Sequence, residues 1–411
     1  MATTAQAVSA EQEAPCLARQ PILTKDEKVI GYEVLFGPDS ANAGSIFKTL
    51  TGVGLDVVCA GGLAFIPCTQ EMLLRDAFFA LPLDKIVIEI QPDIEVNGAV
   101  IETCEQLKQE GYKIAIDKFS QGDSREQLLP FASLLKIDLA SEGSAQLAAA
   151  HARKPYKVLA QKVDSRSEFA EAKKAGFTLF QGNFFRFPER MRVRQIPAGQ
   201  TSKLRLLQAV SVPEVDFDLV EELIRHDASL CVRLLRYLNS PLLGFSVPIH
   251  SVHHGISLLG ERAIIRWIRS AIAMNLGQPK CSDLVLASLV RARFCELIAS
   301  KVDHGSADLF LLGMLSLMDA ILETPMEIVL EGLAFDPHAK AALLAIKNGG
   351  GARLSPICDL MMVRDKGDWE RVAAYAEKLN LSLPLVNRAY IEAMGWAHEI
   401  TNAAQPQSKA R

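Results

Sequence analysis

The stretch Tyr112–Gly122, YKIAIDKFSQG, decides how the first half of this 411-residue chain folds. A short apolar run, Ile114–Ile116, follows Gly111, and Asp117 stands where the run ends. Such a run predicts a buried strand of a parallel α/β fold, in which ligands sit at the carboxyl ends of the strands. Asp117 is therefore a candidate functional carboxylate. Its neighbour Lys118 stands where a second acid would be expected if two metal ions were bound here.

Outward from this stretch, apolar runs alternate with helical patterns. The expected strands are Leu17–Leu23, Val29–Phe36, Leu63–Ile66, Ile86–Ile90, Lys113–Ile116, Leu134–Ile137, Val158–Lys162 and Thr178–Phe180. The expected helices are Ala99–Glu110, Ser124–Phe131, Ser144–Ala152 and Ser167–Ala175. We expect the first two strands to form a hairpin across the polar turn Thr24–Lys28. The alternation predicts a mostly parallel sheet, and the seven regularly spaced strands from Val29–Phe36 onward are enough to close a barrel.

From residue 203 onward, every periodic segment is helical. The expected helices are Phe217–His226, Ser229–Leu238, Ser251–Leu259, Glu261–Leu276, Leu284–Val302, Asp308–Leu322, Pro337–Lys347, Trp369–Leu379 and Leu385–Ile400. The fold class is thus α/β plus all-α. The expected division is a disordered leader over 1–14, a barrel over 15–190, a linker over 191–202, a helical domain over 203–401 and a polar tail over 402–411.

Composition excludes several classes of function. The net charge of −4 provides no basic field for nucleic acid, and the arginines of Phe185–Gln200 fit a solvated linker better than a nucleic-acid patch. Eight scattered cysteines without a CxxC pair indicate free thiols in a reducing cytosol. Residues 1–14 lack a signal-peptide core, and no window reaches the roughly 20 apolar residues of a membrane span. We expect a cytoplasmic protein with neither nucleic acid nor membrane as partner.

Polar side chains recur at the ends of the expected strands. They are Glu33, Glu89, Asp117, Lys136, Asp138, Lys162, Asp164 and Gln181. Carboxylate oxygens at several strand ends suit Mg²⁺ or Mn²⁺, and two such ions could activate a water against a phosphodiester. The alternative is that the acids cap the strands or pair with Lys136 and Lys162. Spacing alone slightly favours this alternative.

Six motifs in this order resemble the EAL domain of cyclic di-GMP phosphodiesterases: GYEVLF, IEI, IDKFSQG, LKID, LAQKVD and FQGNFF. The resemblance covers about residues 16–190. It implies a TIM-like barrel that hydrolyses cyclic di-GMP with two divalent metals. The positions that match the family's site residues are Glu33, Glu89, Asp117, Lys136 and Gln181. If any metal bound, its ligands would be Glu33, Glu89 and Asp117.

The departures from the family's motifs carry more weight than the matches. Gly37 lies where the family has a substrate-contacting arginine, and Pro67 lies where it has an asparagine metal ligand. Pro92 replaces an acid that steadies the metal-site loop, and Lys118 replaces the second aspartate. Gln161 replaces a glutamate that binds metal or acts as a base. A proline offers no side-chain oxygen. The ammonium of Lys118 can occupy the space of a cation beside Asp117, and Gln161 cannot take a proton from water. We therefore expect no catalytic residue, no metal and no cofactor.

The helical half resembles the HDOD domain, a relative of the HD phosphohydrolases found in bacterial signalling proteins. The resemblance runs from about Ser202 to Trp396 and rests on a linked set of residues. These are Asp227, Leu234, Leu235, Asn239, Ser240, Ile256, Leu259 and Gly260. The pair His226-Asp227 spells the name of the HD enzymes. Metal chemistry would require further ligands from other helices, so we interpret the pair as coincidental.

Other histidines and acids of the helical half could also be read as metal ligands. His250, His253 and His254 cluster, and His304 and Asp308 lie one helical turn apart. Asp319 falls where an HD enzyme would carry its metal-binding His-Asp, yet Ser316 and Leu317 precede it. Structural or surface roles are favoured for all of them.

Together these patterns predict a degenerate EAL-HDOD protein of bacterial signal transduction. The favoured hypothesis is a non-catalytic module that contacts other signalling proteins, with a homodimer allowed, in or near cyclic di-GMP signalling. The first alternative is an active phosphodiesterase that requires Mg or Mn. The second is a metal-free receptor that binds cyclic di-GMP weakly, since Gly37 cannot hold a phosphate.

Overall fold

The computed structural model describes residues 16–37, 46–47, 50, 53–74, 77–184, 206–207, 209–212, 214–225, 230, 233–234, 237–239, 243, 257–276, 282–302, 309–331, 340–344 and 356–404. The chain divides into two compact units. The first contains residues up to Phe187 together with Met362–Ala376 and Ser382–Arg388. The second contains Pro188–Met361, Glu377–Leu381 and Ala389–Arg411.

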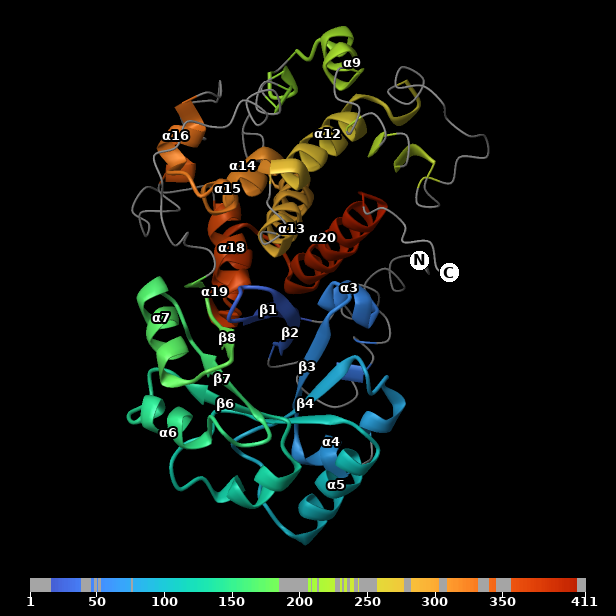
Figure 1. Ribbon diagram of the computed structural model, residues 1–411. Coiled ribbons are helices and arrows are strands. Elements are labelled where there is room, and N and C mark those ends of the chain that lie inside the picture. Colours follow the sequence, from blue (N-terminus) through green and yellow to red (C-terminus); the bar gives the residue numbers. More distant parts are fainter. Residues whose placement is uncertain are drawn as a thin grey trace, which may run out of the picture. The chain divides into compact units, whose positions relative to one another are not determined.

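The first unit is built on a closed barrel whose strands follow one another in sequence order, from β1 to β8 (Figure 1, blue to green). The strands are β1 Leu17–Thr24, β2 Val29–Phe36, β3 Leu63–Cys68, β4 Ile86–Ile90, β5 Lys113–Ile116, β6 Leu134–Asp138, β7 Lys157–Gln161 and β8 Leu179–Gln181. The expected hairpin is confirmed, because β1 pairs antiparallel with β2. The prediction that seven strands close the barrel is wrong. β1 pairs antiparallel with β8 as well, so it is the eighth member of the barrel wall.

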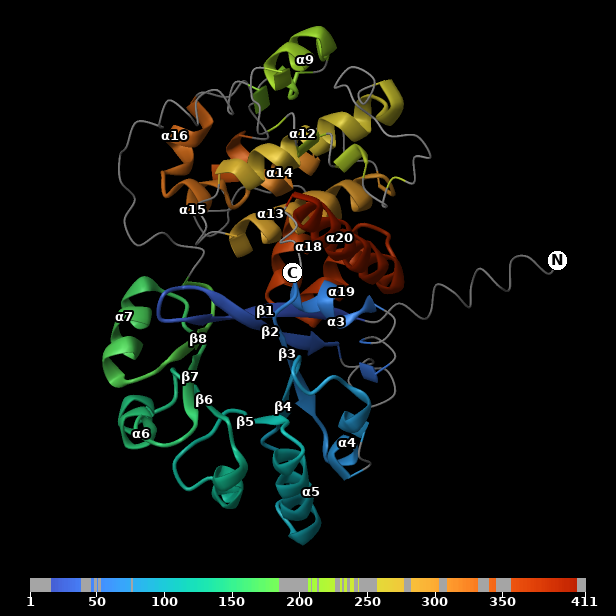
Figure 2. The ribbon, with the colours of Figure 1, turned by 45° about the vertical axis from the view of Figure 1, so that its right-hand side comes forward.

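Helices lie on the outside of the strands (Figure 2). They are α3 Leu55–Cys59, α4 Gln70–Leu74, α5 Gly98–Gln109, α6 Ser144–His151 and α7 Arg166–Ala175, with short 3₁₀ segments η2 Ala77–Ala80 and η3 Ser124–Phe131. The helix expected over Ser124–Phe131 is confirmed in its bounds; it is a 3₁₀ helix and contains Pro130. Helix α7 begins with a capping box: the Ser165 hydroxyl accepts a hydrogen bond from the Glu168 amide, and the Glu168 carboxylate accepts one from the Ser165 amide.

Strand β3 continues two residues past the predicted end, through Pro67 to Cys68. A proline has no N–H for a ladder, so it is expected at an unpaired edge. The pairing of β2 with β3 stops at Phe65, while β3 and β4 stay paired as far as Cys68. Pro67 thus lies in the part of β3 that has lost its β2 neighbour.

The second unit is helical. Helices that lie wholly in it are α9 Phe217–Arg225, α12 Glu261–Leu276, α13 Ser282–Ala299, α14 Leu309–Leu315, α15 Met318–Leu322 and α16 Met326–Glu331. Three later helices divide their residues between the units: α18 Pro356–Asp365, α19 Trp369–Lys378 and α20 Leu383–Ala404. The single helix expected over Asp308–Leu322 is wrong. It is interrupted at Ser316, whose hydroxyl donates back to the Gly313 carbonyl at 2.7 Å.

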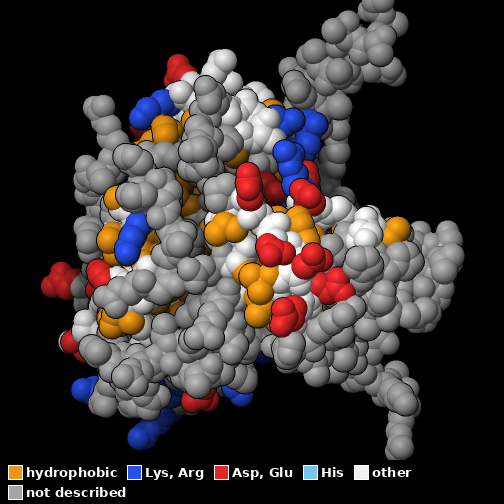
Figure 3. Space-filling view, turned by 90° about the horizontal axis from the view of Figure 1, so that it is seen from above, with side chains coloured by type: hydrophobic (Ala, Val, Ile, Leu, Met, Phe, Trp, Pro, Cys, Tyr) orange, Lys and Arg blue, Asp and Glu red, His pale blue; other side chains and the backbone are white. Residues whose placement is uncertain are grey.

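Helix α9 is strongly two-sided. Val220 and Ile224 are buried, whereas Asp218 and Leu219 are exposed. On the face shown in Figure 3, acidic side chains gather beside apolar ones. Within the described ranges, no helix has both the length and the apolar character needed to cross a membrane.

Candidate functional site at the carboxyl end of the barrel

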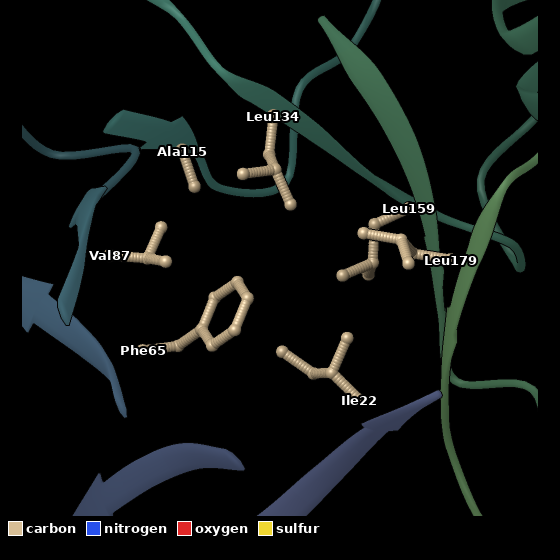
Figure 4. Packing of buried hydrophobic residues seen from close by; sticks show 7 residues of the cluster. All are labelled: Ile22, Phe65, Val87, Ala115, Leu134, Leu159 and Leu179. Atoms are coloured by element: carbon tan, nitrogen blue, oxygen red, sulfur yellow. The ribbon is translucent and has the colours of Figure 1, made fainter. Parts of the chain in front are cut away.

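The barrel interior is filled by a layer of apolar side chains that point toward one another (Figure 4). They are Ile22, Phe65, Val87, Ala115, Leu134, Leu159 and Leu179. Strand β2 contributes Gly31, which pairs with Ile22 and has no room for a side chain, because a Cβ there would lie 2.2 Å from the Leu63 carbonyl oxygen. This layer fills the barrel interior just below the carboxyl ends of the strands, so the barrel is a packed core and not a pore.

Two residues further along each strand, toward the carboxyl end of the barrel, the layer turns polar. Side chains alternate between the two faces of a strand, so these residues point into the same interior. The second layer consists of Gln20, Glu33, Pro67, Glu89, Asp117, Lys136, Gln161 and Gln181. We call it the polar ring. It brings together all five residues that match the EAL site and two of the replaced positions, Pro67 and Gln161.

The Lys136 ammonium lies at the centre of the polar ring. Its Nζ is 2.7 Å from Glu33 Oε2, 2.5 Å from Glu89 Oε1 and 3.2 Å from Asp117 Oδ1. Lys136 and Glu89 are fully buried. The pairing of acids with Lys136 that spacing favoured is confirmed, as is the pairing of Lys162 with Asp138 at 2.6 Å. Three carboxylates around one ammonium carry a formal charge of −2 when all are ionised.

Two glutamine amides complete the contacts of these carboxylates. Gln161 Nε2 donates to Asp117 Oδ1 at 2.9 Å, and Gln181 Nε2 donates to Glu33 Oε2 at 2.5 Å and to Gln20 Oε1 at 2.7 Å. Three buried oxygens of the ring have no hydrogen-bond partner: Glu89 Oε2, Gln161 Oε1 and Gln181 Oε1. All three are acceptors, so the ring has a surplus of acceptors over donors.

Burial and neighbouring charges shift the pKa values of Glu89 and Lys136, the two fully buried partners of the polar ring. Burial raises the pKa of the Glu89 carboxyl well above its ordinary value; the Glu33 carboxylate adds to the rise and Lys136 opposes it. Burial alone would lower the pKa of Lys136, but the carboxylates of Glu33, Glu89 and Asp117 raise it well above the ordinary lysine value. Lys136 is therefore a permanent cation at neutral pH.

A buried arginine that the sequence reasoning missed holds two strand ends in place. Arg125 donates to the Ile90 carbonyl at 2.9 Å and to the Asp117 carbonyl at 2.8 Å. Ile90 directly follows Glu89, so these two bonds hold the backbone beside Glu89 and at Asp117. It also pairs with Asp123 at 2.7 Å. Burial would raise the pKa of Asp123, but hydrogen bonds from Arg125 hold it below its usual value. No periodicity distinguishes such an anchor from a surface arginine.

Three replaced positions lie outside the polar ring. Lys118 is exposed and adopts a left-handed backbone, with φ of 47°. The central ammonium is therefore that of Lys136 and not, as the sequence suggested, that of Lys118. Pro92 is exposed in the loop after β4. Gly37 is buried, and a Cβ there would lie 2.7 Å from both Cβ and Sγ of Cys16, so the backbone as it stands leaves no room for an arginine.

The candidate residues of the helical half lie mostly outside the described residues. This holds for His226, Asp227, the cluster of His250, His253 and His254, and the pair His304 and Asp308. Asp319 is described and is buried in α15. Throughout the portion of the chain with described coordinates, no set of three or more His, Cys, Asp and Glu side chains is arranged to hold a metal ion.

Comparison with known proteins identifies relatives along nearly the whole chain. The HDOD domain family matches residues 196–322. Cyclic di-GMP phosphodiesterase CdgJ of Vibrio cholerae is 32% identical over 407 residues, which cover 93% of this chain and 92% of that protein. The uncharacterised protein YuxH of Bacillus subtilis is 28% identical over 410 residues, 94% of this chain and 99% of that one.

Among solved structures, an EAL-domain protein from Listeria monocytogenes matches 45% of this chain and 92% of its own, with 16% identity and a TM-score of 0.34. That level of similarity has no bearing on function. The extent and identity of the CdgJ match, the HDOD match and the closed barrel lead to one assignment. The chain belongs to the EAL-HDOD family of signalling proteins.

Proposed function

We propose that this chain is a non-catalytic EAL-HDOD protein that acts in cyclic di-GMP signalling through contact with other proteins. The observation that carries the proposal is the buried Lys136 ammonium, which occupies the centre of the polar ring. Its three carboxylates are held by the Lys136 ammonium, and two of them also accept from the amides of Gln161 and Gln181. Each carboxylate that could take a proton from water is thus already paired with a buried cation through one of its oxygens, although Glu89 Oε2 has no hydrogen-bond partner.

The donor set does not fit the pair of divalent ions that the family implies. Divalent ions of this class require several oxygen ligands each. Pro67, which pairs with β4 beyond the last β2–β3 pair, offers no donor, and Gln161 donates its amide to Asp117 and has only its uncharged Oε1 to offer an ion. No group of acids or histidines in the described chain is arranged as a metal site.

The enzyme alternative draws support from the name of CdgJ, a cyclic di-GMP phosphodiesterase of similar length. The test is incubation of the purified full chain with cyclic di-GMP and Mn²⁺ or Mg²⁺, with linear dinucleotide measured by chromatography. We expect no product above the buffer rate. The matched control is Asp117→Asn, because a contaminating hydrolase would be insensitive to it. Product formation that Asp117→Asn abolishes would overturn the proposal.

The receptor alternative is separable by calorimetry. Titration with cyclic di-GMP in chelator reports binding without metal, and a second titration in Mn²⁺ reports binding with it. Gly37 provides no guanidinium for a phosphate, and its contact with Cys16 leaves no space for one. We expect both titrations to be flat. Heat of binding in chelator would establish a receptor and would remove protein contact as the sole role.

A further inference from the structure

The barrel unit contains a part of the chain that is remote in sequence. Residues 362–376 and 382–388 cluster with the barrel and not with the rest of the helical half. The HDOD match ends at residue 322, so this segment lies beyond it. Within the unit, α19 lies beside β1 and β2 (Figures 1 and 2).

Arg364, near the end of α18, anchors this segment to the first strand. Its guanidinium is 0% exposed. Nη2 donates to the Leu17 carbonyl at 2.9 Å, and Nη1 donates to Asn387 Oδ1 at 3.0 Å. The guanidinium also lies over the Trp369 ring, 5.6 Å from its centroid. One buried cation thus joins β1, α18, the start of α19 and α20, and removing it would leave the buried Leu17 carbonyl without this donor.

The turn between α18 and α19 reaches the mouth side of β2. Gly367 has φ of 69°, and a Cβ there would lie 2.9 Å from Leu35 Cδ1. Leu35 lies two residues beyond Glu33 on the same face of β2, toward the carboxyl end of the barrel. The turn is tight, because the Gly367 and Asp368 amides donate back to the carbonyls of Arg364 and Val363.

This contact falls on the side of the mouth that has lost its substrate arginine. The Leu17 carbonyl accepts a hydrogen bond from Arg364, and Leu17 pairs with Phe36 across the β1–β2 hairpin. Gly37 follows Phe36 and packs against Cys16. The guanidinium in this region is fully buried and bonded to a backbone carbonyl, so it cannot hold a ligand phosphate.

We propose that the α18–α19 turn is a built-in cap of the barrel mouth, anchored by Arg364, that covers the β1–β2 rim with the protein's own chain. Removing the anchor uncovers this rim while the far side of the barrel stays intact. This role of the turn does not depend on whether the barrel is catalytic.

The test is hydrogen exchange with mass spectrometry on the full chain and its Arg364→Ala variant. We expect exchange in peptides spanning Leu17–Phe36 to rise by at least about tenfold, while peptides of β4 to β7 keep their protection. A second readout is the labelling rate of the Cys16 thiol, mapped by mass spectrometry. It should rise in the same variant, because Cys16 lies beside Gly37 at the uncovered rim.

The matched control is Arg371→Ala on α19, since that side chain is 58% exposed. It should behave as the wild type in both readouts. Asn387→Ala removes one of the two hydrogen bonds and keeps the other, so it gives a milder version of the effect if Arg364→Ala does not fold. Unchanged exchange in Leu17–Phe36, or an equal loss of protection over all eight strands, would overturn the cap.

Discussion

At the scale of single residues, Lys136 decides whether the polar ring is stable. Its ammonium has no contact with water and is surrounded by three carboxylates. Removing one partner of a buried ion pair leaves uncompensated charge and costs about 3–5 kcal/mol. Here the uncompensated charge would belong to three carboxylates, which cannot all remain ionised side by side.

Lys136→Met is therefore expected to lower the free energy of unfolding of the barrel by about 3–5 kcal/mol. Hydrogen exchange of the barrel peptides, recorded at increasing urea concentrations, measures this free energy of unfolding. Lys162→Met is the matched control, because that ammonium also pairs with a carboxylate but is 63% exposed. An exposed pair contributes about 0–1 kcal/mol, so equal losses in the two variants would contradict the central role of Lys136.

Glu89 gives the ring a pH dependence with a definite sign. Burial raises the pKa of this carboxyl, so the folded state binds its proton more tightly than the unfolded state does. The resulting stabilisation is present below the ordinary glutamate pKa of about 4.3 and is lost as pH rises through the folded value. Relative to Glu89→Gln, the wild type should lose about 1.4 kcal/mol of stability per pH unit in that window. Parallel urea-unfolding profiles for the two proteins from acid to neutral pH would argue against it.

At the scale of elements, the turn after β8 fixes the position of Gln181. Gly182 has φ of 154°, and a Cβ there would lie 2.0 Å from the Val163 carbonyl oxygen. The backbone of Val163 is held here from both sides, because its amide donates to the Gln181 carbonyl and its carbonyl accepts from the Phe184 amide. Neither strand end can move away from an added methyl without losing these bonds.

We expect Gly182→Ala to destabilise the barrel by more than about 2 kcal/mol, as overpacking against backbone does. Gly98→Ala is the control, since that glycine begins α5 and its added Cβ would meet nothing within 4 Å. It should be neutral or stabilising by about 0.4–1 kcal/mol. Thermal unfolding of the two variants makes the comparison, and a Gly182→Ala protein that melts with the wild type would refute the expected clash.

Elements were predictable where local pattern and burial agree. The strands Val29–Phe36, Ile86–Ile90 and Lys113–Ile116 have the predicted bounds, because their apolar runs end at turn residues. Ring closure by β1 was not predictable, since it depends on pairing with β8 more than 150 residues away, which no local period encodes. The same holds for the site: its acids stand at strand ends in the sequence, but their convergence on Lys136 and the anchors Gln20 and Arg125 depend on barrel geometry.

At the scale of the whole molecule, the order of the sequence does not follow the order of the compact units. The chain passes through the barrel, then the helical unit, and returns to the barrel with residues 362–376 and 382–388. In this returning segment Val363, Val372, Ala376 and Val386 are buried. The barrel unit therefore depends on residues that follow the HDOD match, and a cut made between the two sequence motifs would leave it incomplete.

A chain that ends at residue 355, before α18, should accordingly retain the eight strands yet lose protection in β1 and β2. The physical reason is that the Leu17 carbonyl loses its buried donor, Arg364, and that Leu35 loses its contact with Gly367. Hydrogen exchange of Leu17–Phe36 peptides compares the full and shortened chains. Removing only residues 405–411 is the control, because it leaves α18, α19 and α20 whole. Equal protection of β1 and β2 in the full and shortened chains would mean that these strands do not need the returning segment, and that the barrel is complete without it.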